Sequence, residues 1–132
     1  MCGFGGIISK TKLPNIDFLN GSKKYIQNRG PDAFEAIQYK KNKNNFYFKN
    51  SRLSIIDLKE SSNQPFEKDD SILVFNGEIY NYLELQKKYL SKDCLNTSSD
   101  TEVLITLLNK FGIDILNELN GMFAFAYLNK KQ

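Results

Sequence analysis

The amino-acid sequence predicts an α+β fold in a single domain, and three observations lead to this prediction. The chain has 132 residues, which is enough for one domain with a substantial core and too few for two. Hydrophobic residues make up 41% and charged residues 25% of the chain, a balance typical of globular proteins. Strand-like and helix-like runs follow one another without the strict strand–helix–strand order of a parallel α/β fold, so the α+β class is expected.

The first half of the chain is expected to form mostly strands. Apolar residues predict a buried strand over Gly3–Ser9, and weak helical spacing follows over Asn15–Gln27. Adjacent glycine and proline residues predict a turn over Asn28–Asp32. Three more strands are expected, with a polar turn of lysine and asparagine between the first two, at Phe34–Tyr39, Asn45–Phe48 and Arg52–Asp57.

The second half contains the clearest helix of the chain. This helix begins at Ser99, carries its apolar residues on one face and is expected to end at Gly112, a residue suited to a C-terminal cap. The apolar face consists of Val103, Leu104, Leu107, Leu108 and Phe111. The other expected elements are a strand at Ser71–Phe75, helices at Tyr80–Leu90 and Ile113–Leu119, and a buried strand at Gly121–Leu128.

The composition excludes several kinds of function. The chain has no histidine, which removes Ser–His and Cys–His nucleophile pairs and the commonest metal ligand. Two cysteines, Cys2 and Cys94, cannot build a disulfide framework or a structural zinc site, so no metal is expected and a cytoplasmic, reducing compartment fits best. The net charge of +3 is scattered, and no apolar run approaches the roughly 18–20 residues of a membrane span, so neither nucleic acid nor membrane is an expected partner.

The absence of histidine makes Cys2 the main candidate nucleophile. If Met1 is removed, the thiol and the free α-amino group belong to the same residue, and such an amine is a recognised base for an N-terminal nucleophile. The α-amino group titrates close to neutral pH, which suits a general base. The alternative is that Cys2 is a small buried hydrophobic residue near a chain end.

Three further sites each allow a structural and a functional interpretation. Asn76-Gly77 is a strong hairpin signal, but an asparagine amide followed by a glycine N–H could also form an oxyanion hole. Asp100 lies within the helix-capping box Ser99-x-x-Glu102, or its carboxylate could bind a substrate ammonium. Arg52 is either a surface charge or a bidentate ligand for a carboxylate.

Six short motifs occur in the order seen in class II glutamine amidotransferase domains, and the chain resembles that family over its whole length. The motifs are Met1-Cys2-Gly3, Arg29-Gly30-Pro31-Asp32, Arg52-Leu53-Ser54-Ile55-Ile56-Asp57, Gln64-Pro65, Phe75-Asn76-Gly77-Glu78-Ile79-Tyr80-Asn81 and Ser99-Asp100-Thr101-Glu102. The Arg-Leu-Ser-Ile-Ile-Asp and Gln-Pro segments are similar to those of the asparagine-synthetase branch. Many relatives have histidine where this chain has Asn28 and Ser51.

The resemblance implies an N-terminal-nucleophile hydrolase fold, an αββα sandwich of two antiparallel sheets between helical layers. It implies that Cys2 attacks the side-chain amide of L-glutamine, with Asn76 and Gly77 as the oxyanion hole. Arg52 would hold the α-carboxylate, and Glu78 and Asp100 would receive the α-ammonium. The full set of implied glutamine-binding residues is Arg52, Leu53, Ser54, Ile55, Ile56, Asn76, Gly77, Glu78 and Asp100.

The resemblance also implies that residues 1–132 are the N-terminal part of a glutamine amidotransferase type 2 domain, incomplete at the C-terminus. Relatives continue with further strands and then a synthetase domain, which would act in cis or in trans. No cofactor is expected for glutamine hydrolysis, whereas ATP and Mg²⁺ are expected for the synthetase domain, where ammonia would amidate aspartate or a related carboxylate. The alternative is a truncated, non-catalytic fragment that binds glutamine or docks on a partner. Association into a homo-oligomer is a further possibility.

Overall fold

The computed structural model describes residues 2–91 and 94–131. Within them, two antiparallel three-stranded sheets have the strand orders β1-β3-β2 and β4-β5-β6. The strands are β1 Gly3–Ser9, β2 Ala33–Lys41, β3 Asn44–Arg52, β4 Phe66–Lys68, β5 Ser71–Ile79 and β6 Gly121–Asn129. The α-helices are α1 Ile16–Gly21, α2 Tyr82–Tyr89 and α3 Asp100–Phe111, and 3₁₀ helices include Ser22–Tyr25, Gln27–Arg29, Glu60–Ser62 and Gly112–Glu118.

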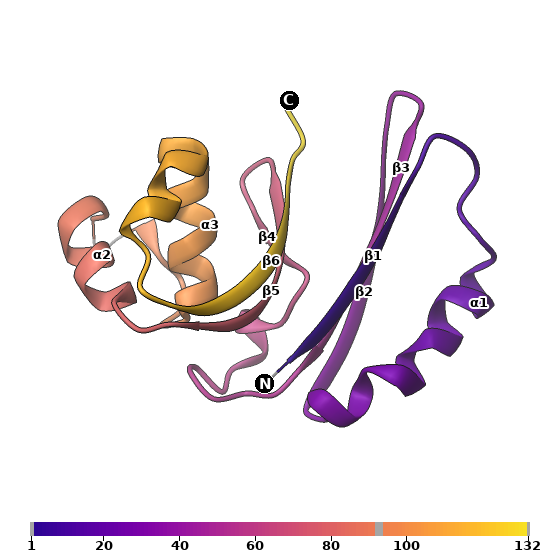
Figure 1. Cartoon of the computed structure of the whole chain (residues 1–132), viewed down its shortest axis with the longest axis horizontal. Helices are drawn as coiled ribbons and strands as arrows, with labels where there is room; N and C mark the ends of the chain where they lie inside the picture. Colours follow the sequence, from indigo (N-terminus) through magenta and orange to yellow (C-terminus); the bar gives the residue numbers. More distant parts are fainter. Residues whose placement is uncertain (1, 92–93, 132) are drawn as a thin grey trace.

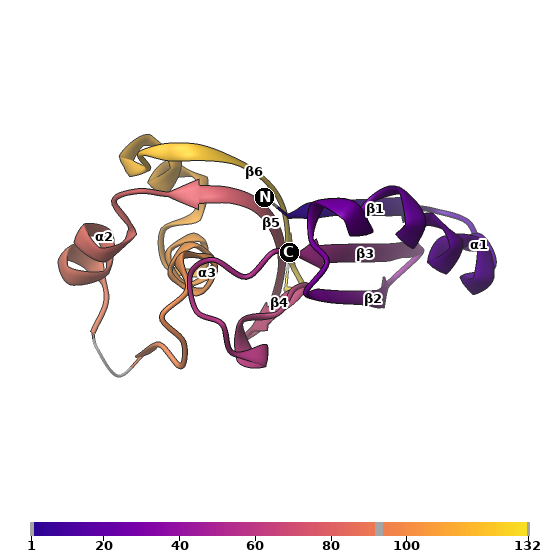
Figure 2. The same cartoon turned by 90° about the horizontal axis from the view of Figure 1, so that it is seen from below.

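The two sheets pack face to face, with helices on both outer sides (Figure 1). Helix α1 lies beside the first sheet, whereas α3 packs on the outer face of the second and α2 packs against α3, as the turned view in Figure 2 also shows. This layering confirms the expected α+β class and the αββα sandwich. In the part of the chain that the structure describes, no helix is long and apolar enough to cross a membrane.

Strand β5 shows how the sequence builds these layers. Successive side chains of a strand point to opposite faces of its sheet. Ile72 and Val74 pack with Phe48 of β3 between the two sheets, whereas Leu73 and Phe75 belong to the core formed with α3. Because β5 is covered on both faces, its sequence is a continuous apolar run rather than an alternating one.

Helix α3 confirms the clearest helix prediction. Its expected face is buried at Val103, Leu104, Leu107 and Leu108, and the backbone turns at Gly112, where φ is +67°. Phe111, also expected on this face, is 37% exposed at the end of the helix. Ile105, outside the predicted face, is also fully buried, because α3 is covered by α2 and by the 3₁₀ helix after it as well as by the sheet.

Several predicted elements differ from the observed ones. The strand expected at Arg52–Asp57 is wrong: β3 ends at Arg52, and residues 53–57 form a loop. The strand expected at Ser71–Phe75 continues to Ile79 because β6 pairs with it along its whole length. The hairpin interpretation of Asn76-Gly77 is therefore wrong, since both residues lie inside a strand. The short strand β4 was not predicted.

Candidate active site

One cavity brings together the N-terminus of β1, the loop after β3, the end of β5 and the start of α3. Eight of the ten residues expected in the site line this cavity: Cys2, Arg52, Leu53, Ile55, Ile56, Gly77, Glu78 and Asp100. Ser54 and Asn76 are sequence neighbours of lining residues but do not line the cavity themselves. The lining also includes residues that sequence reasoning did not assign to the site, namely Gln64, Phe75, Tyr80, Ser99, Thr101 and Met122.

Strand pairing places Cys2 in the cavity. Gly3 of β1 lies opposite Ser51 of β3. Cys2, the residue before Gly3, therefore lies beside the end of β3, where the loop 53–57 begins. The Cys2 Sγ atom lies 3.4 Å from the Leu53 backbone N–H, which donates to it, and 3.6 Å from the Leu53 carbonyl oxygen. Arg29 Nε donates to the Cys2 carbonyl oxygen at 3.2 Å. The half-buried thiol therefore has a defined position against the loop.

Gly77 occupies a position that only glycine fits. Its φ is +146°, and a Cβ atom there would lie 2.1 Å from the Met122 carbonyl oxygen of β6. The neighbouring Asn76 has a buried side-chain Oδ1 atom without a hydrogen-bond partner in residues 2–91 and 94–131. A buried polar atom left unpaired is an exception in folded proteins. In the described residues Tyr47, Asn50 and Ser62 also carry such atoms.

Arg52 is not a surface charge, because it is only 5% exposed. One terminal nitrogen donates to the Lys59 carbonyl oxygen at 3.0 Å and to Asn63 Oδ1 at 2.9 Å. The other donates to the carbonyl oxygens of Ile56 and Asp57. In this structure the two terminal nitrogens therefore hold the loop, and a substrate carboxylate would have to use Nε or displace some of these contacts.

Two acidic side chains, Asp100 and Glu78, also line the cavity. Asp100 is 5% exposed, and its Oδ2 atom accepts the Ile79 backbone N–H at 3.1 Å. Burial raises the pKa of Asp100, and the negative charge of the exposed Glu78 raises it further. Backbone hydrogen bonds to the carboxylate lower the pKa but do not offset these effects. A cation placed between the two carboxylates would relieve both the burial cost and the repulsion.

Gln64 is a buried residue of the cavity lining that contacts β3, β5 and α3. Its Oε1 atom accepts the Phe75 backbone N–H at 2.6 Å and Asn50 Nδ2 at 3.2 Å. Its Nε2 atom donates to Thr101 Oγ1 at 3.4 Å. The Gln-Pro motif was the available signal for this position, whereas Phe75, Tyr80, Ser99 and Thr101 flank residues already assigned to the site.

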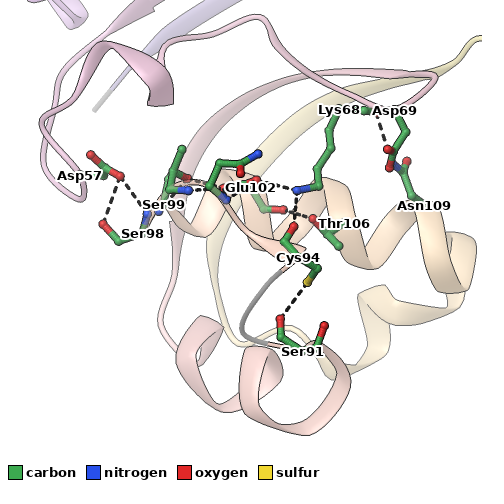
Figure 3. Close-up of polar contacts among 12 residues, drawn as sticks. Asp57, Lys68, Asp69, Ser91, Cys94, Ser98, Ser99, Glu102, Thr106 and Asn109 are labelled. Carbon is green, nitrogen blue, oxygen red and sulfur yellow. Dashed lines mark hydrogen bonds and ion pairs between the residues drawn. The ribbon is translucent and has the colours of Figure 1, made fainter.

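Polar contacts hold the start of α3, as Figure 3 shows. Ser99 caps the helix as predicted, its hydroxyl oxygen accepting the Thr101 N–H at 3.1 Å. Glu102 does not complete the expected reciprocal capping box. Its carboxylate instead accepts Lys68 Nζ at 2.6 Å and the Thr97 backbone N–H at 2.6 Å. Burial alone would raise the pKa of Glu102, but these hydrogen bonds outweigh it and lower the pKa.

A cysteine at the start of a strand, where two facing antiparallel sheets meet, is the arrangement of an N-terminal-nucleophile hydrolase. A family model described as the glutamine amidotransferase domain matches residues 1–132. The chain belongs to this family, which confirms the resemblance seen in its motifs.

Similar curated proteins are named as glutamine-hydrolysing asparagine synthetases. The chain is 37% identical over 148 residues to the putative asparagine synthetase 2 of Methanocaldococcus jannaschii, a match that covers 100% of this chain and 28% of that protein. It is 37% identical over 137 residues to asparagine synthetase 1 of Bacillus subtilis, covering 98% of this chain and 21% of the relative. It is 36% identical over 138 residues to asparagine synthetase 2 of B. subtilis, a match that covers 100% of this chain and 18% of that protein. The chain thus spans less than a third of the length of these relatives.

Proposed function

We propose that this chain hydrolyses L-glutamine to glutamate and ammonia as the glutaminase part of an asparagine-synthetase-like enzyme. One observation carries the proposal: the Cys2 thiol and the buried Asp100 carboxyl line the same cavity. Membership of the glutamine amidotransferase family and the names of the relatives support the same reaction.

The proposed reaction uses Cys2 twice. Its thiol proton moves to its own α-amino group, and the thiolate adds to the amide carbon of glutamine. The amine then returns the proton to the leaving nitrogen, ammonia departs, and a glutamyl thioester remains. Water adds to the thioester, which releases glutamate and restores the thiol. The reaction requires the removal of Met1, a residue that lies outside the described part of the chain.

The remaining site residues would bind and orient the substrate. The Asn76 side-chain amide and the Gly77 backbone N–H would donate to the oxyanion that develops on the attacked amide. Asp100 and Glu78 would hold the α-ammonium, whose positive charge matches the two carboxylates. Arg52 would hold the α-carboxylate through Nε, or through a terminal nitrogen that gives up one of its loop contacts. The backbone of the loop 53–56 would lie along the substrate.

The fate of the ammonia belongs to the same proposal. In the whole protein, a synthetase domain in cis or in trans would use ATP and Mg²⁺ to activate aspartate or a related carboxylate for amidation. The glutaminase reaction itself would need no cofactor. Two free thiols, Cys2 and Cys94, support a reducing cytoplasmic location, and a homo-oligomer is compatible with this arrangement.

Labelling with a glutamine analogue that carries an electrophilic diazoketone in place of the amide tests the proposal. We expect one adduct per chain, on Cys2, together with glutamate release from unlabelled protein. Cys2→Ala should abolish both signals, whereas Cys94→Ala, the matched control, should keep both. Labelling on Cys94, or glutamine binding without any hydrolysis, would favour the non-catalytic alternative.

A further inference from the structure

The loop 53–57 and the start of α3 are separate in sequence but face the same cavity, and one side chain joins them. Asp57 Oδ2 accepts the Ser98 backbone N–H at 2.8 Å and Ser98 Oγ at 3.1 Å. Ser98 directly precedes Ser99, the N-cap of α3, and Asp100 is the first residue of that helix. Figure 3 shows the Asp57–Ser98 contact at the loop side of α3.

Asp57 also organises its own loop. Its Oδ1 atom accepts the Lys59 backbone N–H at 3.0 Å, and its carbonyl oxygen accepts from the Arg52 guanidinium. Its φ is +55°, a left-handed conformation that aspartate tolerates better than most residues. Hydrogen bonds from the Ser98 and Lys59 N–H groups lower the pKa of Asp57 to about 2, so the carboxylate is charged at neutral pH.

These contacts connect two of the three side chains that would hold the α-amino acid end of a substrate, Arg52 and Asp100. The Asp57 backbone carbonyl oxygen accepts from Arg52, and the Asp57 carboxylate accepts from Ser98, which lies two residues before Asp100. Charge-assisted hydrogen bonds are among the stronger links in a protein, and two of the three donors are backbone groups whose positions follow the chain. Moving Ser98 away from Asp57 therefore moves the start of α3 away from the loop.

We propose that Asp57 is a positioning residue that sets the spacing between Arg52 and Asp100, and thereby the affinity of the site for the α-amino acid end of its substrate. This inference rests on the proposed glutamine hydrolysis. Asp57 acts on recognition rather than on the reacting atoms, because its carboxylate faces Ser98 and Lys59 and does not line the cavity.

The Asp57→Asn variant tests the inference, with Asp69→Asn as a matched control. Asparagine also tolerates positive φ, but it replaces one acceptor oxygen with an NH₂ group that cannot accept from Ser98 or Lys59. Asp69 has a similar φ of +51° and accepts Asn109 Nδ2 at 3.3 Å, in the turn between β4 and β5 and outside the cavity lining. Both variants thus make the same chemical change at the same kind of backbone position.

For Asp57→Asn, we expect the KM for glutamine to rise about 10- to 100-fold with kcat changed less than threefold, the scale on which small misplacement of a binding group acts. Amide hydrogen exchange, followed by mass spectrometry, should speed up about tenfold in both segments 54–59 and 97–101, as expected for a lost charge-assisted hydrogen bond. Asp69→Asn should leave both readouts unchanged. Ser98→Ala, which removes only one of the three donors, should raise KM by a few-fold and keeps the test informative if Asp57→Asn folds poorly.

The outcomes separate this inference from the proposed function. Glutamine turnover by the wild-type chain together with an unchanged KM in Asp57→Asn would overturn the positioning role and leave the proposed function intact. Faster exchange in only one of the two segments would also overturn it, because the link between them is the claim. If the wild-type chain does not turn over glutamine, the proposed function fails, and glutamine affinity of the Cys2→Ala chain with and without Asp57→Asn decides the positioning role.

Discussion

At the scale of single residues, two side chains of the site are kept in states that cost folding free energy. Burial raises the pKa of Asp100, and the Asn76 Oδ1 atom is buried without a partner in the described residues. A cation would satisfy the Asp100 carboxylate, whereas the oxyanion proposed beside Asn76 would accept from its Nδ2 group and leave the Oδ1 atom unpaired. Substitutions at these residues should therefore affect stability and function differently.

Asp100→Asn should stabilise the fold at neutral pH and abolish tight glutamine binding. The folded-state pKa of Asp100 is raised above its unfolded value, so its contribution to stability is fully present below the unfolded pKa and is lost as the pH rises through the folded pKa. Asparagine remains neutral and can still accept the Ile79 N–H. Calorimetry should give a higher Tm for the variant at pH 7 and a smaller difference at pH 4, and an equal Tm at pH 7 would contradict the argument.

Asp57 should show the opposite pH dependence. Its pKa falls from the ordinary 3.8 to about 2 in the folded chain, so its stabilising contribution is present above pH 3.8 and is lost as the pH falls towards 2. Urea unfolding from pH 5 to pH 2 should therefore show wild type more stable than Asp57→Asn at pH 5, with the gap closing below pH 4. A gap that does not depend on pH would rule out this electrostatic origin.

Asn76→Ala should lower kcat for glutamine hydrolysis by roughly 10²–10³, the usual loss for one oxyanion-hole donor. KM should change little, because the donor acts on charge that develops only in the transition state. Steady-state kinetics of glutamate release measure both constants. An effect confined to KM would mean that Asn76 contacts the bound glutamine before the reaction and does not form the oxyanion hole.

At the scale of secondary-structure elements, buried polar contacts fasten β3, β5 and α3 to one another. Gln64 contacts one residue from each of these elements, Asn50, Phe75 and Thr101, and it is only 4% exposed. The residues next to two of these partners, Asn76 and Asp100, belong to the proposed site. The relative placement of the elements therefore depends on a side chain outside all three.

Gln64→Leu should destabilise the fold, because it leaves the Phe75 N–H and its other partners without their hydrogen bonds in the core. Each buried group left unpaired costs about 1–3 kcal/mol in the free energy of unfolding. Chemical denaturation should detect this loss, and glutamine turnover should fall with it. Gln38→Leu, at an exposed position in β2, is the matched control and should leave both unchanged. Equal stability of the two variants would show that Gln64 is dispensable.

At the scale of the whole molecule, the second sheet has β6 at its edge in the described part of the chain. This strand carries Phe123, Phe125 and Tyr127, which pack towards the α3 core, and Met122 is 73% exposed. An apolar edge strand presents unpaired backbone groups that can pair with another chain. The isolated chain of residues 1–132 is therefore expected to associate as its concentration rises.

Met122→Lys should weaken this association, because a lysine on an edge strand opposes strand pairing with a second copy. Ile113→Lys is the matched control, since Ile113 is similarly exposed at 75% but lies in the 3₁₀ helix after α3 and not in a sheet. Sedimentation velocity over a range of concentrations should show less association for Met122→Lys only. Equal behaviour of both variants would locate the association elsewhere.

Local sequence patterns by themselves determined the fold class, the family and much of the proposed site. The apolar run of β1, the amphipathic α3 with its Ser99 cap and Gly112 end, and the order of the motifs around Cys2 and Asp100 all depend on residues close in the chain. They were sufficient for the fold class, for the family, and for most residues that line the cavity.

Only the tertiary structure decided how these segments are held together. Asn76-Gly77 lies within β5 rather than in a turn because β6, more than 40 residues later in the chain, pairs with it. Residues 53–57 form a loop rather than a strand because Arg52 and Asp57 direct their hydrogen bonds to the loop itself and to Ser98, 41 residues from Asp57. The hydrogen-bonding groups of a backbone segment need partners, and local sequence does not specify which distant segment supplies them.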